Sequence, residues 1–123
     1  MDASPVIVAL MPMKHHSERV PAKNWRLLSG SPLYAHTLKA LLGSSRVSRV
    51  HINTDTNCVA LEADVLRLFP GDAHRVSVLK RPAELCGDAV PMTALLAHDV
   101  TVVQADFYLQ ARFLVPARAL LFI

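Results

Sequence analysis

The sequence predicts an α/β fold, a three-layer sandwich in which a mostly parallel β-sheet lies between helices. Short apolar runs rich in β-branched residues alternate with longer segments whose apolar residues recur at helical spacing. The first run, VIVALM, is apolar on both faces, which is typical of a parallel strand covered on both sides. Hydrophobic residues make up 52% of the 123 residues, which is ample for the core of one domain.

Four strands are predicted along the chain. They span 6–11 (VIVALM), 49–54 (RVHINT), 75–79 (RVSVL) and 106–110 (DFYLQ). The second run alternates apolar and polar residues, and all four have the usual length of a strand. Because helical segments separate the strands, we expect crossover connections and parallel pairing, with helices on both faces of the sheet.

Three helices are predicted, and each has a recognisable boundary. They span 33–42 (LYAHTLKALL), 59–69 (VALEADVLRLF) and roughly 91–103. Pro32 stands at the start of the first helix and Gly43 at its end. Pro70 and Gly71 close the second helix, and Pro91 opens the third.

Charge and cysteine content exclude several classes of protein. The net charge is +3, but no Lys/Arg run and no basic face interleaved with aromatics exists, so nucleic acid is a poor partner. Cys58 and Cys86 form neither a CxxC pair nor a disulfide framework, which favours a reducing cytoplasm. No signal sequence and no apolar run of membrane-spanning length is present, so we expect a soluble, unexported protein without a membrane partner.

The most informative segment is the loop MPMKHHSERVPAKN (11–24), which follows the first strand. Residues 14–26 begin in this loop and end just after it. These thirteen residues carry four of the thirteen basic side chains of the chain: Lys14, Arg19, Lys23 and Arg26. Ligands of such sheets bind outside the carboxyl ends of the strands, where this loop begins. The cations, with Ser17 and backbone N–H groups, suit a small polyanion such as a triphosphate. The loop contains no glycine and no GK[ST], so it is not a P-loop.

Several of these residues also have purely structural interpretations. Lys14 and Arg19 are open to interpretation as solvated loop charges, and His15 and His16 as surface residues or as phosphate hydrogen-bond donors. Asp55 is open to interpretation as a helix cap, Arg81 as a surface charge and Asp88 as a helix-start residue. Cys58 and Cys86 are interpretable as small apolar side chains. The other four histidines are interpretable as ordinary surface or half-buried residues: His36, His51, His74 and His98.

The loop and several later motifs resemble the sugar-activating cytidylyltransferases, the CMP-acylneuraminate and CMP-deoxy-manno-octulosonate synthetases. The elements that carry the resemblance are Pro12-Met13-Lys14, Ser17-Glu18-Arg19, Pro21-Ala22-Lys23-Asn24, Gly30-Ser31-Pro32-Leu33, Asn53-Thr54-Asp55, Arg81-Pro82-Ala83-Glu84-Leu85 with Asp88, and Tyr108-Leu109-Gln110. They occur in order over residues 6–110, and the Lys-Asn and Arg-Pro-Ala-Glu-Leu elements favour the acylneuraminate branch. The resemblance implies a Rossmann-like nucleotidyltransferase fold, present here in incomplete form.

The resemblance also implies an activity and a set of site residues. The activity is transfer of CMP from CTP to the anomeric hydroxyl of a sialic-acid-like nonulosonate, with release of pyrophosphate. The implied nucleotide-binding residues are Lys14, Ser17, Arg19, Lys23, Asn24 and Arg81, of which Lys14 and Lys23 are the catalytic pair. Asn24 falls beside the ribose, Arg81 at the cytosine edge, and Gln110 at the acceptor sugar.

The chain also departs from the family pattern. Lys14 replaces an arginine, which keeps the charge and loses the bidentate geometry. After Gln110 the segment ARFLVPARALLFI matches no family motif, so we divide the chain into a nucleotide-binding half (1–110) and an off-pattern hydrophobic tail (111–123). Mg²⁺ and a homodimer are implied for complete family members. Asp55, Asp88 and Asp106 form no recognisable metal pattern, so no metal ligand is assigned.

Two functions therefore follow from the sequence. One is a cytidylyltransferase, here in truncated form. The alternative is a non-catalytic nucleotide-binding fragment or pseudoenzyme, since the expected metal-binding half is missing. With that half missing, we also expect the strand ending at Gln110 to leave an open sheet edge, and the isolated chain to self-associate or to be marginally stable.

Overall fold

The computed structural model describes residues 6–13, 23–55, 57–87, 89–103, 105, 107–110 and 113–116, with the backbone alone for residues 23, 107–110 and 113–116. None of the helices in this part of the chain is long and apolar enough to cross a membrane.

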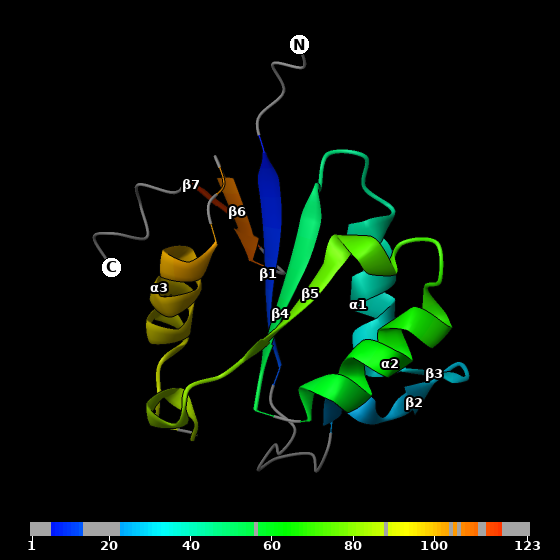
Figure 1. Ribbon diagram of the computed structural model, residues 1–123, viewed down its shortest axis with the longest axis horizontal. Coiled ribbons are helices and arrows are strands. Elements are labelled where there is room, and N and C mark those ends of the chain that lie inside the picture. Colours follow the sequence, from blue (N-terminus) through cyan, green and yellow to red (C-terminus); the bar gives the residue numbers. More distant parts are fainter. Residues whose placement is uncertain are drawn as a thin grey trace.

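A single five-stranded sheet forms the centre of the molecule (Figure 1). Its strands are β1 (Ile7–Met13), β4 (Arg49–Thr54), β5 (Val76–Lys80), β6 (Phe107–Gln110) and β7 (Phe113–Pro116). The spatial order is β5-β4-β1-β6-β7; the first four strands are mutually parallel, and β7 is antiparallel to β6. The predicted mostly parallel sheet is therefore confirmed, with each predicted strand present within two residues of its expected bounds.

Strand β7 corrects one expectation about the end of the chain. The sequence predicts an open edge at β6, but β7 pairs with β6 along its whole length, from Phe107 opposite Pro116 to Gln110 opposite Phe113. The segment FLVP is a short apolar run, and such a run forms a strand when the unpaired edge of another strand lies beside it.

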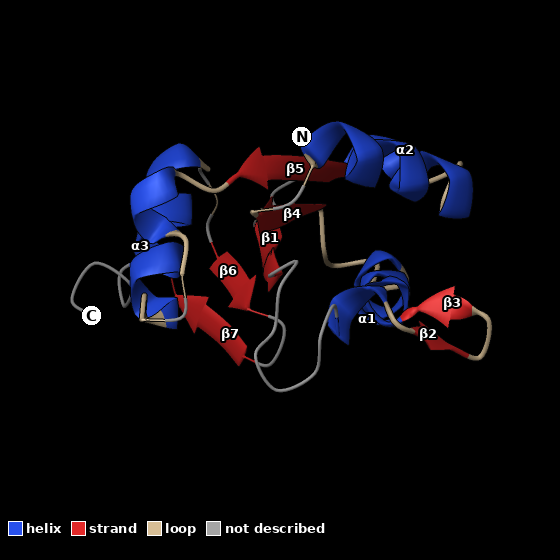
Figure 2. Cartoon of the chain, turned by 90° about the horizontal axis from the view of Figure 1, so that it is seen from below, coloured by secondary structure: helices blue, strands red, loops and turns tan. Residues whose placement is uncertain are grey.

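Helices cover both faces of the sheet (Figure 2). Helices α1 (Leu33–Leu42) and α2 (Cys58–Leu68) lie on one face, and α3 (Met92–Val102) lies on the other. Short 3₁₀ turns occur at η1 (Lys23–Trp25), η2 (Ala73–Arg75) and η3 (Ala83–Leu85), and a small hairpin of β2 (Leu27–Leu28) and β3 (Ser31–Pro32) precedes α1. These elements form the predicted three-layer sandwich.

The central strand explains why both faces need a cover. Side chains alternate along a strand, so β1 sends Met11 and Met13 into the core beneath α1 and α2, and Val8 and Leu10 into a second core beneath α3. All four are at most 5% exposed. A strand that buries both faces reads as a continuous apolar run, which is the pattern found in VIVALM.

The start of α2 differs from one structural interpretation of the sequence. Asn57, not Asp55, is the N-cap: its side-chain Oδ1 accepts a hydrogen bond from the Ala60 N–H at 3.1 Å. This cap moves the beginning of the helix to Cys58, one residue before the predicted start. Asp55 instead directly follows β4, at the carboxyl edge of the sheet.

The carboxyl ends of three strands are level with one another. Met13, the last residue of β1, stands opposite Thr54 at the end of β4, and Thr54 stands opposite Lys80 at the end of β5. Parallel sheets of this type bind ligands at the carboxyl edge, next to the strand where the chain changes direction across the sheet. That strand is β1, because the chain moves outward through β4 and β5 and then returns to the other side of β1 as β6.

Candidate functional site

Arg81 occupies the carboxyl edge of the sheet. It directly follows β5, and its backbone N–H donates to the carbonyl oxygen of Thr54 at 2.9 Å, which continues the alignment between β4 and β5. Only 2% of Arg81 is exposed. Its interpretation as a surface charge is therefore wrong: Pro82 does direct the chain away from the strand, but the arginine side chain folds inward.

Asn53 holds the Arg81 guanidinium in place. The Arg81 Nε donates to Asn53 Oδ1 at 2.8 Å, and Nη2 donates to the Asn53 backbone oxygen at 3.3 Å. The third nitrogen, Nη1, is buried and has no partner among the described residues. A buried N–H without a partner is costly, so a ligand acceptor at this position would relieve that cost.

The network continues from Asn53 into α3. The Asn53 Nδ2 donates to Asp99 Oδ1 at 2.6 Å, and the Nδ1 of His98 lies 3.0 Å from the same oxygen. Asn53 and Asp99 are fully buried, whereas the His98 side chain is 25% exposed. Asp99 Oδ2 has no partner among the described residues. Arg81, Asn53, Asp99 and His98 thus form one polar chain that joins the carboxyl edge of the sheet to the helix behind it.

Sequence reasoning assigned no role to Asn53 or Asp99. Asn53 stood inside a matched motif, Asn53-Thr54-Asp55, without a function of its own. Asp99 carried a usable signal, because it lies three residues after Leu96 and four after Leu95, on the buried stripe of α3. An acidic residue on such a stripe needs a polar partner from another element, and here β4 supplies it.

The same face of β4 carries a row of polar side chains. Arg49, His51 and Asn53 alternate with the buried Val50 and Ile52, so all three face α3. Arg49 Nη2 donates to Ser77 Oγ at 3.0 Å. His51 is 8% exposed, more buried than the sequence analysis expected, and its Nδ1 has no partner among the described residues.

Burial controls the protonation of His51. Desolvation, together with the positive charge of Arg49, lowers the pKa of His51 below its ordinary value of 6.5, and the carboxylate of Asp99 opposes this shift. His51 also lines a pocket of about 330 Å³ with Val6, Val8, Arg49, Ser77, Leu79, Val102 and Val103. This pocket lies at the α3 face of the sheet, away from the strand ends that position Arg81.

The structure also describes two predicted site residues at the end of the loop: all of Asn24, and the backbone of Lys23. Asn24 is half-buried in η1, which packs against α1: the rings of Trp25 and Tyr34 are 5.8 Å apart and tilted by 55°. The backbone of Lys23 opens this turn. Asn24 and Lys23 thus stand at the point where the chain returns from the loop to the first helix.

The remaining predicted site residues are less well placed. The backbone of Gln110 lies beside Leu10, three residues before the carboxyl end of β1. Lys14, Ser17, Arg19 and Asp88 lie outside the described residues. The predicted convergence of these side chains around one nucleotide therefore stays a prediction.

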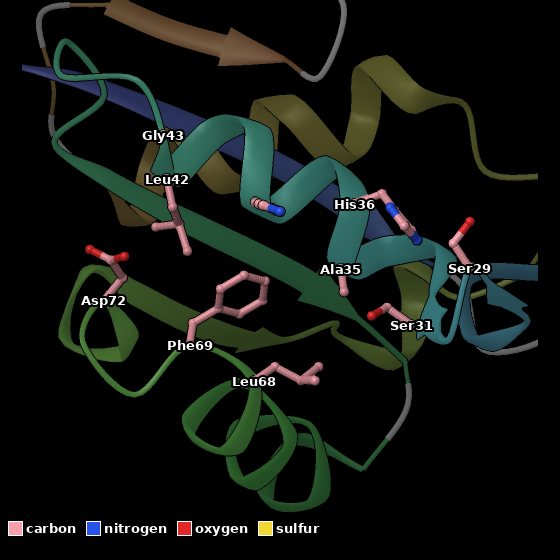
Figure 3. Close-up of a pocket in the computed structure, with 10 residues that line it drawn as sticks. Ser29, Ser31, Ala35, His36, Leu42, Gly43, Leu68, Phe69 and Asp72 are labelled. Carbon is pink, nitrogen blue, oxygen red and sulfur yellow. The ribbon is translucent and has the colours of Figure 1, made fainter.

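A groove between α1 and α2 forms a second pocket, of about 730 Å³ (Figure 3). Its lining comprises Ser29, Ser31, Ala35, His36, Lys39, Leu42, Gly43, Leu68, Phe69 and Asp72. Leu42, Leu68 and Phe69 form its apolar wall, and Asp72 lies at the same end as Gly43. None of the predicted site residues that the structure describes lines this groove, so we place the candidate site at the carboxyl edge, where topology and Arg81 coincide.

The described residues do not form a metal site. No three of their histidine, cysteine, aspartate or glutamate side chains are grouped closely enough to bind an ion. His98 and Asp99 are paired with each other, and the carboxylate of Asp99 is bound to Asn53. The Mg²⁺ that the family resemblance implies thus finds no ligand set in this part of the chain.

Comparison with known proteins identifies the family. The family model of the cytidylyltransferases matches residues 8–80, which is 73 of the 123 residues. The chain belongs to the cytidylyltransferase family. The matched region runs from β1 to the end of β5 and ends one residue before Arg81.

One curated relative and one solved structure are similar to this chain. A CMP-N,N'-diacetyllegionaminic acid synthase of Legionella pneumophila subsp. pneumophila (strain Philadelphia 1) is 44% identical over 54 residues, which cover 44% of this chain and 23% of the synthase. A CMP:2-keto-3-deoxy-manno-octonic acid synthetase, solved in complex with CTP, superposes with a TM-score of 0.61 over 86% of this chain and 40% of the synthetase, at 24% identity. The second match shows the nucleotidyltransferase fold. The chain spans less than half the length of either protein.

Proposed function

We propose that this chain forms the CTP-binding part of a cytidylyltransferase that transfers CMP to a sialic-acid-like nonulosonate and releases pyrophosphate. The observation that carries the proposal is the buried guanidinium of Arg81 at the carboxyl edge, with its Nη1 left without a described partner. Membership of the cytidylyltransferase family supports CTP as the nucleotide. The name of the synthase relative, which specifies a CMP-linked sugar acid, supports a sugar acid as the acceptor.

The proposed reaction is a displacement at the α-phosphorus of CTP. The anomeric hydroxyl oxygen of the sugar acid forms a bond to that phosphorus, and the bond to the oxygen that bridges to the β-phosphate breaks. The hydroxyl proton leaves to solvent or to a base, and pyrophosphate departs with the bonding electron pair. Negative charge grows on the leaving phosphates, so cations fixed beside them accelerate the step.

The loop after β1 supplies those cations in this proposal. Lys14 and Lys23 would neutralise the phosphates, with Arg19 and the Ser17 hydroxyl as additional phosphate ligands. Asn24 would hydrogen-bond the ribose, and the Arg81 Nη1 would donate to an acceptor on the cytosine ring. Gln110 would contact the acceptor sugar. The family resemblance also implies Mg²⁺, to which we assign no residue of this chain.

A second candidate is a non-catalytic nucleotide-binding module. One observation favours it: no carboxylate cluster able to hold a metal ion exists among the described residues. Phosphoryl transfer normally relies on such an ion to bridge the phosphates. A pyrophosphate-release assay with CTP, Mg²⁺ and a nonulosonate separates the two candidates, because the module would bind CTP without releasing pyrophosphate.

Calorimetric titration of CTP tests the phosphate-binding role of the loop. We expect Lys23→Ala to weaken CTP binding by about 1.5–3 kcal/mol, the scale of a charge-assisted hydrogen bond. Lys39→Ala is the matched control, since Lys39 is exposed on α1 and lines the groove between α1 and α2. Loss of affinity in Lys39→Ala, with none in Lys23→Ala, would move the triphosphate site to that groove.

Competition between nucleotides tests the role of Arg81. The unmodified chain should bind CTP more tightly than ATP or GTP, because Arg81 would donate a hydrogen bond to an acceptor on the pyrimidine ring of cytosine. Arg81→Ala should remove this preference while circular dichroism confirms that the chain remains folded. Equal affinity of the unmodified chain for all three nucleotides would contradict the proposed function.

A further inference from the structure

Asp99 is a buried charge that the proposed reaction does not use. It is 0% exposed, lies within the last turns of α3, and contacts β4 rather than solvent. A carboxylate without compensating hydrogen bonds in such surroundings is strongly destabilising. The groups around Asp99 must therefore compensate its carboxylate by hydrogen bonding, and the polar chain that leads to Arg81 includes these groups.

The Asn53 amide has one orientation that satisfies both of its neighbours. A guanidinium only donates hydrogen bonds and an ionised carboxylate only accepts them. The amide oxygen therefore faces Arg81 Nε at 2.8 Å, and the amide nitrogen faces Asp99 Oδ1 at 2.6 Å. With Asp99 in place, a flip of the amide would break both hydrogen bonds at once. The carboxylate therefore keeps the amide oxygen of Asn53 directed toward Arg81.

Asn53 also determines which guanidinium nitrogen remains for a ligand. Its side chain binds Nε and its backbone oxygen binds Nη2, so Nη1 alone lacks a described partner. Loss of the Nε contact would free the guanidinium to rotate about its side-chain bonds. Nη1 would then no longer be held at one position beside the carboxyl edge.

We infer that Asp99 is a positioning residue which, through Asn53, holds Arg81 with Nη1 directed to a carbonyl acceptor of a pyrimidine base. The inference deepens the proposed function and rests on it, because it assigns the base contact to Arg81. Uracil and cytosine both carry a carbonyl at the same ring position, so this contact serves pyrimidines as a class. Discrimination between CTP and UTP must then come from other residues.

The test compares Asp99→Asn with a matched control, Asp64→Asn. The first variant keeps the size of the side chain and removes the charge that orients Asn53. The control removes the same charge from a half-exposed position on α2, where Asp64 pairs with Arg67 at 3.4 Å. A second variant, Asn53→Ser, breaks the same link without touching the buried charge, so the test survives if Asp99→Asn does not fold.

Two measurements are made on each variant in the full chain. The first is calorimetric affinity for CTP, UTP and inorganic tripolyphosphate, which has the phosphates without the base. The second is the ¹⁵N–¹H signal of the Arg81 side-chain Nε–H, assigned by its disappearance in Arg81→Lys, together with its rate of hydrogen exchange. A residue with only a structural role would not alter affinity for the base while leaving affinity for tripolyphosphate unchanged.

We expect Asp99→Asn and Asn53→Ser to weaken CTP and UTP binding about tenfold, to leave tripolyphosphate binding unchanged, and to shift the Arg81 signal and speed its exchange. Asp64→Asn should change neither measurement. An Arg81 signal that is unchanged in both variants would overturn the inference, whether or not CTP binds. Wild-type chain that binds CTP no better than tripolyphosphate would instead overturn the base contact, and with it the proposed function.

Discussion

At the scale of single residues, a neutral amide between two buried charges is the feature that organises the site. Among the described contacts, none joins the guanidinium of Arg81 directly to the carboxylate of Asp99. Asn53 forms a hydrogen bond with each of them. This arrangement gives each charged group a hydrogen-bond partner and keeps the two groups apart, but it leaves one atom of each, Nη1 and Oδ2, without a described partner. Removing the amide would leave both charges underbonded in a region from which water is excluded.

We predict that Asn53→Ala lowers the free energy of unfolding by roughly 2–4 kcal/mol, since it leaves buried donors and acceptors without partners. Urea denaturation measures the change. Asn57→Ala is the control, because Asn57 is exposed and makes one capping bond, to the Ala60 N–H, whose loss costs about 1 kcal/mol. Equal losses in the two variants would show that the buried network contributes no more than an exposed cap.

At the scale of elements, the strands were predictable because burial leaves a local signal. VIVALM and RVHINT are apolar or alternating runs of strand length, and both form strands at these positions. The first strand continues past its predicted end, through Pro12 to Met13. Strand β4 pairs with this extension, because Pro12 stands opposite Asn53 and Met13 stands opposite Thr54.

The site itself was only partly predictable for a physical reason. Arg81 was found because a local motif surrounds it. Asp99 was not, because its partner Asn53 lies 46 positions earlier in the chain and meets it only when α3 packs on the sheet. The same reason applies to β7, whose pairing with β6 depends on a neighbour that FLVP does not encode by itself.

The hairpin of β2 and β3 offers a prediction about backbone conformation. Its two turn residues, Ser29 (φ 52°) and Gly30 (φ 83°), both adopt positive φ, as a type I′ turn requires. A Cβ on Gly30 would meet nothing within 4 Å, so the cost of Gly30→Ala comes from the backbone alone and should be about 1 kcal/mol in urea unfolding. Gly71 also has open space and lacks a positive φ, so Gly71→Ala should cause no loss. A larger loss in Gly71→Ala than in Gly30→Ala would contradict this explanation.

At the scale of the whole molecule, the two faces of the sheet differ in polarity. Beneath α1 and α2 the contacts are apolar, with Val50, Ile52 and Leu38 fully buried. Beneath α3, Arg49, His51 and Asn53 run along β4. The apolar face gives the fold its stability by removing hydrocarbon from water. The polar face leads to Arg81 at the carboxyl edge, and its groups make the stability of the fold depend on pH.

His51 determines the sign of that dependence. Burial lowers its pKa in the folded protein below 6.5, whereas the unfolded chain titrates near 6.5. As the pH falls below 6.5, the unfolded state therefore takes up a proton that the folded state does not yet bind, and protonation favours unfolding. The contribution of His51 is fully present above pH 6.5, is lost as the pH falls, and stops changing once the pH is below the lowered pKa.

We therefore predict that wild-type protein loses stability as the pH falls below 6.5, and that His51→Gln reduces the slope of this loss. Urea unfolding at a series of pH values measures the free energy of unfolding for both proteins. His74→Gln is the control, because His74 is exposed, and it should keep the wild-type slope. Arg49 and Asp99, which face His51, are present in both proteins, so the difference between the two curves isolates the imidazole. Parallel curves for wild type and His51→Gln would mean that His51 binds its proton equally well in the folded and unfolded states, and the polar face of the sheet would then be open to water at that position.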